Sequence, residues 1–538
     1  MSTTVSTGEV SRWRGALSGV LSVLTALGFG HLAAGLINIE SSPIFAVGNA
    51  VIDVTPNPMK EFAIAQFGED NKYVLLASMA VVLVLAAAVA GALSRRSWIP
   101  GIALISLLGA VAVLATVTRP TFFAPDLVAP IVSFAAGVGA FFWLHTAAKQ
   151  KEVAVPAAGA ADTTPEEGSA ESTTKEFTWE IPGVGRRTFL VSSSVVAASA
   201  GLAGLGGRLA AQSIDVEASR QALNLVPDEP APPIPSGADF VDNGTPAFIT
   251  PNNEFYRVDT ALTVPRLRAE TWRMRIHGMV DREIVLTYDD LLARPLVEKT
   301  ISLVCVSNEV GGPYISTANF IGVLLSDILE EAGVDPQSDQ IATTSSDGWT
   351  CGTPVDVVMA PGSDALIAIG MNGEPLPAQH GFPVRMVVPG LYGFVSATKW
   401  LVDMELTTFA DFTPYWVRRN WAERAPVKTM SRIDRPKSFS RVPAGPFIAA
   451  GISWAQRVGI DKVEVRVDGG PWLEADLSTE VNIDTWRMWK IELNLEPGSH
   501  RIQCRATDRN GETQTEERVA PIPDGATGWH SIAFTAGS

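Results

Sequence analysis

The stretch Ile301-Ser-Leu-Val-Cys-Val-Ser-Asn-Glu-Val-Gly-Gly312 places a single thiol, Cys305, where an apolar run ends and a polar, glycine-rich turn begins. Short apolar runs bounded by turn residues are typical of buried strands. The chain has 3 cysteines, the others being Cys351 and Cys504, and no CxxC motif. This excludes a disulfide framework, a zinc ribbon and c-type haem attachment. A lone thiol at a strand end, in a chain that also offers basic and amide side chains, favours a metal or nucleophile site.

The region upstream of this stretch is apolar in a way that indicates membrane spans. Five segments lack Asp, Glu, Lys and Arg over about a membrane thickness, and these are residues 15–39, 73–94, 97–118, 127–148 and 188–207. Buried core helices are the alternative, but the first four segments are consecutive and bounded by charges or proline. We therefore expect a membrane bundle that contacts lipid.

Basic residues flank these segments on one common side, which sets the expected orientation. They are Arg12, Arg14, Arg95, Arg96, Lys149, Lys151, Arg186 and Arg187. If that side is cytoplasmic, the N-terminus is cytoplasmic and everything after about residue 207 lies outside, as does the acidic loop from Glu40 to Asp70. We expect a multi-pass protein of the cell membrane with its C-terminal domains on the outer side.

The fifth segment differs from the other four. Gly185-Arg-Arg-Thr-Phe-Leu190 precedes a weakly hydrophobic run rich in Ser, Ala and Gly. This resembles a twin-arginine export signal, which serves proteins that fold around a cofactor before they cross the membrane. An ordinary pair of positive-inside arginines is the alternative. We expect the segment to be retained as an anchor.

Composition and pattern divide the chain into six parts. A net charge of −16 argues against nucleic acid as a partner. The expected parts are four transmembrane helices (1–150), a flexible cytoplasmic linker (151–185), the fifth helix (186–210), a Pro-rich strap (211–246), an α+β catalytic domain (247–410) and a β-sandwich (411–538).

Strand-like runs and turn signals support the last two parts. Runs at 272–276, 301–304 and 384–388 and a helical pattern at 324–332, separated by Gly and Pro, suit an α+β domain. From about residue 440 the pattern is all-β, with alternation at 463–468, 489–495 and 500–506. Asp468-Gly-Gly-Pro is a hairpin turn signal. Short strands at this spacing predict a sandwich.

Four segments of the outer region carry the chemistry. They are Thr250-Pro-Asn-Asn-Glu-Phe-Tyr-Arg-Val-Asp259, the Cys305 stretch, Gln379-His-Gly-Phe-Pro-Val-Arg-Met-Val-Val-Pro-Gly-Leu-Tyr-Gly393 and Phe394-Val-Ser-Ala-Thr-Lys-Trp400. A Gly-rich turn flanked by Arg385 and Lys399 can hold a phosphate. His380 and Asn253 can read the edges of a polar heterocycle, and a thiolate binds a soft or high-valent metal.

Together these segments resemble the sulfite oxidase family of molybdopterin enzymes, which includes a periplasmic methionine sulfoxide reductase subunit. The resemblance covers about residues 240–525 and implies an oxidoreductase with a molybdenum-molybdopterin cofactor. It also implies that the β-rich tail is an immunoglobulin-like dimerisation domain, with a homodimer as one outcome. Electrons would pass to or from a separate cytochrome or quinone-linked partner, while a small molecule serves as substrate.

The resemblance also assigns roles residue by residue. Cys305 would be the thiolate ligand of molybdenum, and it forms the catalytic set with Tyr256 and Arg257. The cofactor-binding set would be Asn253, Tyr256, Arg257, His380, Arg385, Ser396, Thr398 and Lys399. Four of these side chains also have an ordinary structural alternative: burial for Cys305, a turn for His380, a surface charge for Arg385 and core packing for Tyr256.

The residues after Cys305 depart from the family pattern. Sulfite oxidases continue into arginines that help to bind the sulfite anion, whereas this chain reads Ser307-Asn-Glu-Val310. Glu309 would repel an anion unless it points away. The resemblance and the predicted topology together lead us to expect oxygen-atom transfer outside the cytoplasm at a Cys-ligated molybdenum. Reduction of an S- or N-oxide, in the manner of methionine sulfoxide reductase, and a non-catalytic membrane scaffold remain the alternatives.

Overall fold

The computed structural model describes residues 9–56, 71–119, 122–149, 184–212 and 215–537, with isolated residues between 57 and 70. The chain divides into two compact units, Met1–Ser213 and Ile214–Ser538, and each is described by itself. Most of the predicted linker at 151–185 lies outside the described residues.

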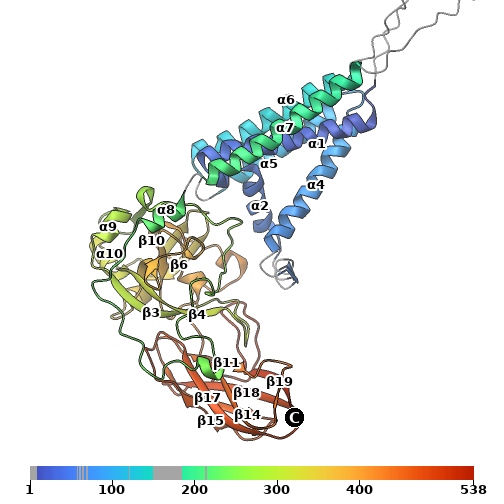
Figure 1. Cartoon of the computed structure of the whole chain (residues 1–538). Helices are drawn as coiled ribbons and strands as arrows, with labels where there is room; N and C mark the ends of the chain where they lie inside the picture. Colours follow the sequence, from blue (N-terminus) through green and yellow to red (C-terminus); the bar gives the residue numbers. More distant parts are fainter. Residues whose placement is uncertain are drawn as a thin grey trace, which may run out of the picture. The chain divides into compact units, whose positions relative to one another are not determined.

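The first unit is a helical bundle (Figure 1). Five of its helices are long and apolar enough to cross a membrane. Their bounds are α1 Arg12–Ile37, α4 Asn71–Leu93, α5 Ile99–Val117, α6 Val128–Lys149 and α7 Val184–Gln212. The predicted loop from Glu40 to Asp70 contains a further apolar helix, α2 (Pro43–Val54), and the unit also includes the short 3₁₀ turns η1 (Ile39–Ser41) and η3 (Ala124–Leu127).

Helix α1 packs against α4, α6 and α7 through small residues. Gly19 lies so close to the carbonyl of Ala87 in α4 that any added Cβ would overlap it, and Gly28 meets Ala200 of α7 in the same way. Close backbone approach of this kind is how helices associate where lipid removes the hydrophobic drive between them.

The second unit begins with an α+β region built on two sheets. One has the strand order β2-β1-β10-β5-β6 and the other β3-β4-β7-β8, with β9 paired to β7. The strands are β1 Arg273–Gly278, β2 Ile284–Thr287, β3 Val297–Val304, β4 Ile315–Leu324, β5 Gln340–Ser345, β6 Thr350–Pro354, β7 Leu366–Met371, β8 Glu374–Pro375, β9 Arg385–Val387 and β10 Leu401–Thr407. The helices are α8 Val216–Gln221, α9 Tyr288–Leu292, α10 Leu325–Ala332 and α11 Val355–Val358. Among the 3₁₀ turns, η6 (Ala378–His380) and η7 (Gly393–Val395) lie in the predicted chemical segments.

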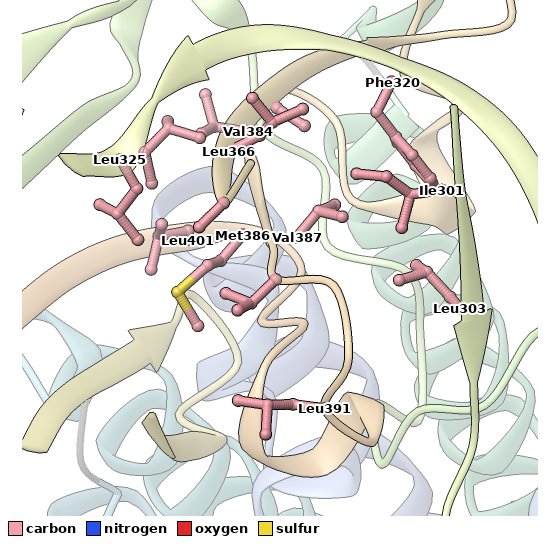
Figure 2. Close-up of a cluster of buried hydrophobic side chains, with 14 of the residues drawn as sticks. Ile301, Leu303, Phe320, Leu325, Leu366, Val384, Met386, Val387, Leu391 and Leu401 are labelled. Atoms are coloured by element: carbon pink, nitrogen blue, oxygen red, sulfur yellow. The ribbon is translucent and has the colours of Figure 1, made fainter. Parts of the chain in front are cut away.

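A shared hydrophobic core joins the two sheets of this region. Figure 2 shows side chains from β3, β4, β7, β9 and β10 gathered into one cluster, including Ile301, Phe320 and Met386. Strand β3 is buried over its last five residues, so its sequence is a continuous apolar run rather than an alternation. The predicted runs at 272–276, 301–304, 324–332 and 384–388 coincide with β1, β3, α10 and β9.

The C-terminal region holds two further sheets that share a second core. Their strand orders are β11-β13-β17-β16 and β12-β19-β18-β14-β15. The strands are β11 Met430–Arg435, β12 Arg441–Pro443, β13 Gly445–Trp454, β14 Ile460–Val467, β15 Leu473–Glu474, β16 Asp476–Leu477, β17 Arg487–Leu495, β18 Gly498–Asp508 and β19 His530–Gly537. The turn after β14 has positive φ at Asp468 (54°) and Gly469 (71°), as a primed hairpin turn requires. We use "the sandwich" as a label for this region; that it is an immunoglobulin-like β-sandwich stays a prediction.

Candidate active site

Cys305 lies directly after β3, where the chain leaves the sheet. Its backbone N–H donates to the Tyr314 carbonyl at 3.0 Å, which extends the β3–β4 ladder by one step. Its Sγ lies 2.9 Å from the Ser307 hydroxyl. Burial raises the pKa of this thiol, while hydrogen bonds from Ser307 and the charge of Lys399 act in the opposite direction. The thiol therefore keeps its proton unless a stronger cation, such as a metal ion, replaces it.

Tyr256 brings a hydroxyl to the same place. Its backbone N–H donates to Ser316 Oγ at 3.2 Å, and its ring stacks on Phe255 at 5.4 Å between centroids. The hydroxyl would lie 4.0 Å from a Cβ on Gly393, a position that is also 3.7 Å from the Val304 carbonyl. Burial and the nearby Cys305 raise the pKa of Tyr256, and Arg385 lowers it. Tyr256 is therefore a neutral donor beside the thiol.

Arg385 is a buried cation whose hydrogen bonds are incomplete. Its side chain stems from β9, the residue is 5% exposed, and Nη1 donates to the His380 carbonyl at 3.1 Å. Its Nε is buried without a hydrogen-bond partner among the described residues. Burial lowers the pKa of Arg385 to about 10. A buried guanidinium with a spare donor calls for an anionic acceptor.

Lys399 and Arg257 share one carboxylate close to Arg385. Lys399 Nζ donates to Asp259 Oδ2 at 2.7 Å, and Arg257 Nε donates to the same oxygen at 2.8 Å. Burial lowers the pKa of Lys399 to about 8, helped by Arg385 and Arg257 and opposed by Asp259. Trp400, at φ +52°, lies 4.6 Å beneath the Lys399 ammonium. A bulky residue in the left-handed region indicates a strained backbone.

His380 lies beside these cations and is itself neutral. Its Nε2 lies 3.0 Å from the Asn252 carbonyl, and because a carbonyl only accepts, Nε2 carries the proton. Burial lowers the pKa of His380 to about 4, and Arg385 and Lys399 add to this effect. Gly381, at φ +114°, separates Arg385 from Lys399, since an added Cβ would lie 3.0 Å and 3.2 Å from their Cβ atoms. The glycine allows both cationic stems to converge.

The structure thus brings Cys305, Tyr256, Arg257, His380, Arg385 and Lys399 into one region, and it places the remaining predicted residues differently. Asn253 is exposed. The preceding Asn252 instead contacts His380 through its carbonyl and receives the Asn372 amide at 2.8 Å. The Ser396 hydroxyl donates to the Tyr392 carbonyl at 3.0 Å, so its side chain could meet a ligand only as an acceptor.

Thr398 and the two other cysteines lie inside the fold. Thr398 is fully buried, and its hydroxyl pairs with that of Thr343 at 2.6 Å. Cys351 and Cys504 are both buried. In the described part of the chain no group of three or more His, Cys, Asp or Glu side chains could hold a metal ion.

Two carboxylates near these cations, those of Asp259 and Asp347, could not be identified as site residues from the sequence. Asp259 has a side chain only 5% exposed and serves as the counter-ion of Lys399 and Arg257. Asp347 lies near it; burial raises the pKa of Asp347, Asp259 raises it further, and Lys399 lowers it. The one available signal was that Asp259 ends the Phe-Tyr-Arg-Val-Asp segment. Its partner Lys399 is 140 residues away, so the pairing itself is a tertiary event.

Comparison with known proteins defines the class to which this site belongs. The family described as "Oxidoreductase molybdopterin binding domain" matches residues 261–416. The mitochondrial sulfite oxidase of Rattus norvegicus is 30% identical over 326 residues, which cover 52% of this chain and 59% of that protein. The uncharacterized oxidoreductase YuiH of Bacillus subtilis is 34% identical over 153 residues, 28% of this chain and 73% of that one. The chain therefore belongs to the molybdopterin-binding oxidoreductases related to sulfite oxidase.

A solved structure and the coverage complete the comparison. The sulfane dehydrogenase SoxCD of Paracoccus pantotrophus aligns with a TM-score of 0.47 at 22% identity, over 54% of this chain and 84% of that one. The chain spans only 59% of the length of the rat sulfite oxidase. Family membership confirms two predictions: an oxidoreductase class and a molybdenum-molybdopterin cofactor.

The residues present fit this cofactor. Its phosphate is an anion with several acceptor oxygens, and the structure offers the buried Arg385 with its spare Nε beside Lys399. Its metal needs a thiolate, and Cys305 is the one cysteine of the chain that is not fully buried. Arg385, Lys399 and His380 would therefore hold the pterin and its phosphate, while Cys305 would hold molybdenum.

Proposed function

We propose that the chain is a membrane-anchored oxidoreductase that transfers an oxygen atom to or from a small substrate outside the cytoplasm. The observation that carries this proposal is the buried, incompletely bonded Arg385 near the neutral hydroxyl of Tyr256, which also lies near the Cys305 thiol. When bound, molybdenum-molybdopterin supplies a two-electron redox couple that can exchange oxygen with a substrate. The chain's own residues bind the cofactor, orient it and exclude water.

Each side chain then has a defined task. Arg385 and Lys399 neutralise the cofactor phosphate, and the ring of His380, locked by the Asn252 carbonyl, presents Nδ1 as an acceptor. The protonated hydroxyl of Tyr256 is available as a donor to an oxygen atom near the thiol, because burial keeps it neutral. Arg257 is tied to Asp259, and with its side chain 33% exposed it can reach solvent or an incoming substrate.

A neutral S- or N-oxide suits the surroundings of Cys305 better than sulfite does. The loop after the cysteine contains exposed Glu309 and, from Val306 to Pro313, neither Arg nor Lys. The cations that are present are tied to Asp259 or to the carbonyl of His380. Sulfite oxidation remains the second candidate, supported by the 30% identity to rat sulfite oxidase.

The membrane setting rests on the first unit. Five helices are candidate spans, and the basic residues that flank the apolar segments favour a cytoplasmic N-terminus. A topology reporter fused after residue 538 should be active only outside the cytoplasm. Replacing Arg186 and Arg187 by Lys should block export if the twin-arginine route is used. Unchanged export of that variant would exclude the route.

The test of the proposed function combines metal analysis with activity. Purified protein should contain molybdenum and should lose its activity when Cys305 is replaced by Ala. Cys504→Ala is the matched control, because Cys504 is a buried thiol of the sandwich that contacts Ser431. Sulfite oxidation is assayed with an oxidised dye as electron acceptor, and reduction of a panel of S- and N-oxides with a reduced dye as electron donor. The two assays distinguish the two candidate substrate classes. Protein without molybdenum would instead favour a non-catalytic membrane scaffold.

A further inference from the structure

The loop from Cys305 to Tyr314 is held by side chains of the sandwich, and we propose that this contact positions the cysteine thiol. We call this segment the cysteine loop, and we call Arg432, Asp434 and His530 the clamp. The inference rests on the proposed function, because it gives the sandwich a role in that same site. The clamp lies outside residues 261–416, the part that matches the family.

The cysteine loop is internally bonded and can move only as a body. The Asn308 N–H donates to the Cys305 carbonyl at 3.0 Å, and the Asn308 side-chain oxygen accepts the Tyr314 N–H at 2.9 Å. The Gly312 N–H donates to the Glu309 carbonyl at 2.8 Å, which closes the turn. A displacement of Gly312 should therefore also displace Cys305, because the hydrogen bonds of Asn308 connect the two ends of the loop.

Arg432 connects this loop to β11. The residue is 8% exposed, its Nη1 donates to the Gly312 carbonyl at 3.0 Å, and its Nε donates to Asp434 Oδ1 at 3.0 Å. Asp434 is itself buried, and burial raises its pKa while Arg432 lowers it. A planar guanidinium can serve a carboxylate and a carbonyl at once, which a point-like ammonium does less well.

His530 meets the loop one residue earlier. Its Nδ1 accepts the Ile433 N–H at 2.9 Å, so the ring proton of the neutral form is on Nε2. Nε2 lies against Gly311, where an added Cβ would overlap the ring, and Gly311 has φ +84°. Only glycine satisfies both conditions. Burial lowers the pKa of His530 to about 4, and Arg432 and Arg518 add to this effect.

Two adjacent loop residues are thus fixed from the sandwich, Gly312 by a charged hydrogen bond and Gly311 by a close-packed ring. The loop's other end, Cys305, is fixed by the β3–β4 ladder. The geometry makes Arg432 and His530 positioning residues for Cys305: neither has to touch the substrate, and both define where the loop can lie.

The first test compares Arg432→Lys with Arg457→Lys in the full-length holoenzyme. Arg457 is a matched control because it also pairs with an aspartate, Asp484 at 2.9 Å, and donates to a carbonyl of the α+β region, Gly362 at 2.8 Å, on another loop. We expect amide hydrogen exchange at residues 306–314 to accelerate about tenfold in Arg432→Lys, the ratio that corresponds to one lost charged hydrogen bond. Exchange there should be unchanged in Arg457→Lys.

The second test uses a pair of variants at the histidine contact. Gly311→Ala should accelerate exchange in the loop and alter the electron paramagnetic resonance signal of the metal, and adding His530→Ala should reverse part of both changes. The inference is overturned if Arg432→Lys matches Arg457→Lys, or if the double variant matches Gly311→Ala. Wild-type protein without molybdenum would refute the proposed function alone, because the exchange measurement still tests the clamp in metal-free protein.

Discussion

Replacing Arg385 by Met should affect the cofactor-free and the cofactor-loaded protein in opposite directions. In the cofactor-free protein the guanidinium is a buried cation with an unpaired Nε. The difference between its ordinary pKa near 12.5 and the value of about 10 in the fold corresponds to roughly 3 kcal/mol of unfavourable burial. The folded pKa is the lower one, so this cost is fully present at pH 7.

Methionine removes that cost and also the hydrogen bond to the His380 carbonyl, which contributes about 1.5 kcal/mol or more. We therefore expect the cofactor-free variant to unfold with a free energy about 0–2 kcal/mol higher than that of the wild type. In the loaded protein the same change removes a charged donor to the phosphate. Retention of the cofactor should then weaken about ten- to a hundredfold.

The assay is a pair of measurements on each variant, namely denaturant unfolding of cofactor-free protein and molybdenum content after dialysis. Arg424→Met is the control, because Arg424 is an exposed arginine paired with Asp356. This variant should change the free energy of unfolding by no more than about 1 kcal/mol and should keep its molybdenum. The reasoning is refuted if Arg385→Met keeps its molybdenum, or if the cofactor-free variant loses several kcal/mol of stability.

Three further expectations follow from the site. The pKa of Lys399 is about 8 in the folded state, below its ordinary value of 10.5. Burying the charged ammonium therefore destabilises the fold at pH values below 8, and this cost decreases as the pH rises above 8. Cofactor retention by the wild type should have the opposite pH dependence and fall above pH 8, whereas Lys399→Arg should keep its cofactor there. If retention by the wild type does not change with pH, a charged Lys399 does not hold the cofactor. Gly381→Ala, with φ +114° and Cβ contacts at 3.0 Å and 3.2 Å, should destabilise the fold by about 1–3 kcal/mol and reduce molybdenum content, and a thermal melt equal to wild type would contradict this. Thr398→Val should lose about 1 kcal/mol of stability through its bond to Thr343 but no molybdenum, and loss of the metal would show that the hydroxyl reaches the cofactor after all.

Local pattern was enough to predict the elements that carry the site. The apolar run that ends at Val304, the helical pattern of α10 and the alternating strands of the sandwich all follow from neighbouring residues, and so does the hairpin turn at Asp468. Helix α2 was missed because it falls within a segment read as an acidic loop, although its own residues are mostly apolar.

Side-chain direction and distant pairing could not be predicted. The sequence motif indicated Asn253, which is exposed, whereas the neighbouring Asn252 contacts His380 through its carbonyl. Ser396 and Thr398 lie in the expected segment, but their hydroxyls bond to protein atoms: that of Ser396 to a carbonyl four residues earlier and that of Thr398 to the distant Thr343. Asp259 and the clamp depend on contacts between residues more than a hundred positions apart, which no local pattern encodes.

The central claim is that Cys305 ligates molybdenum, and X-ray absorption at the molybdenum edge tests it most directly. The wild type should show one more sulfur neighbour than a Cys305→Ser variant reconstituted with the same cofactor. Cys504→Ala should match the wild type. Equal sulfur coordination in the wild type and Cys305→Ser would contradict the assignment.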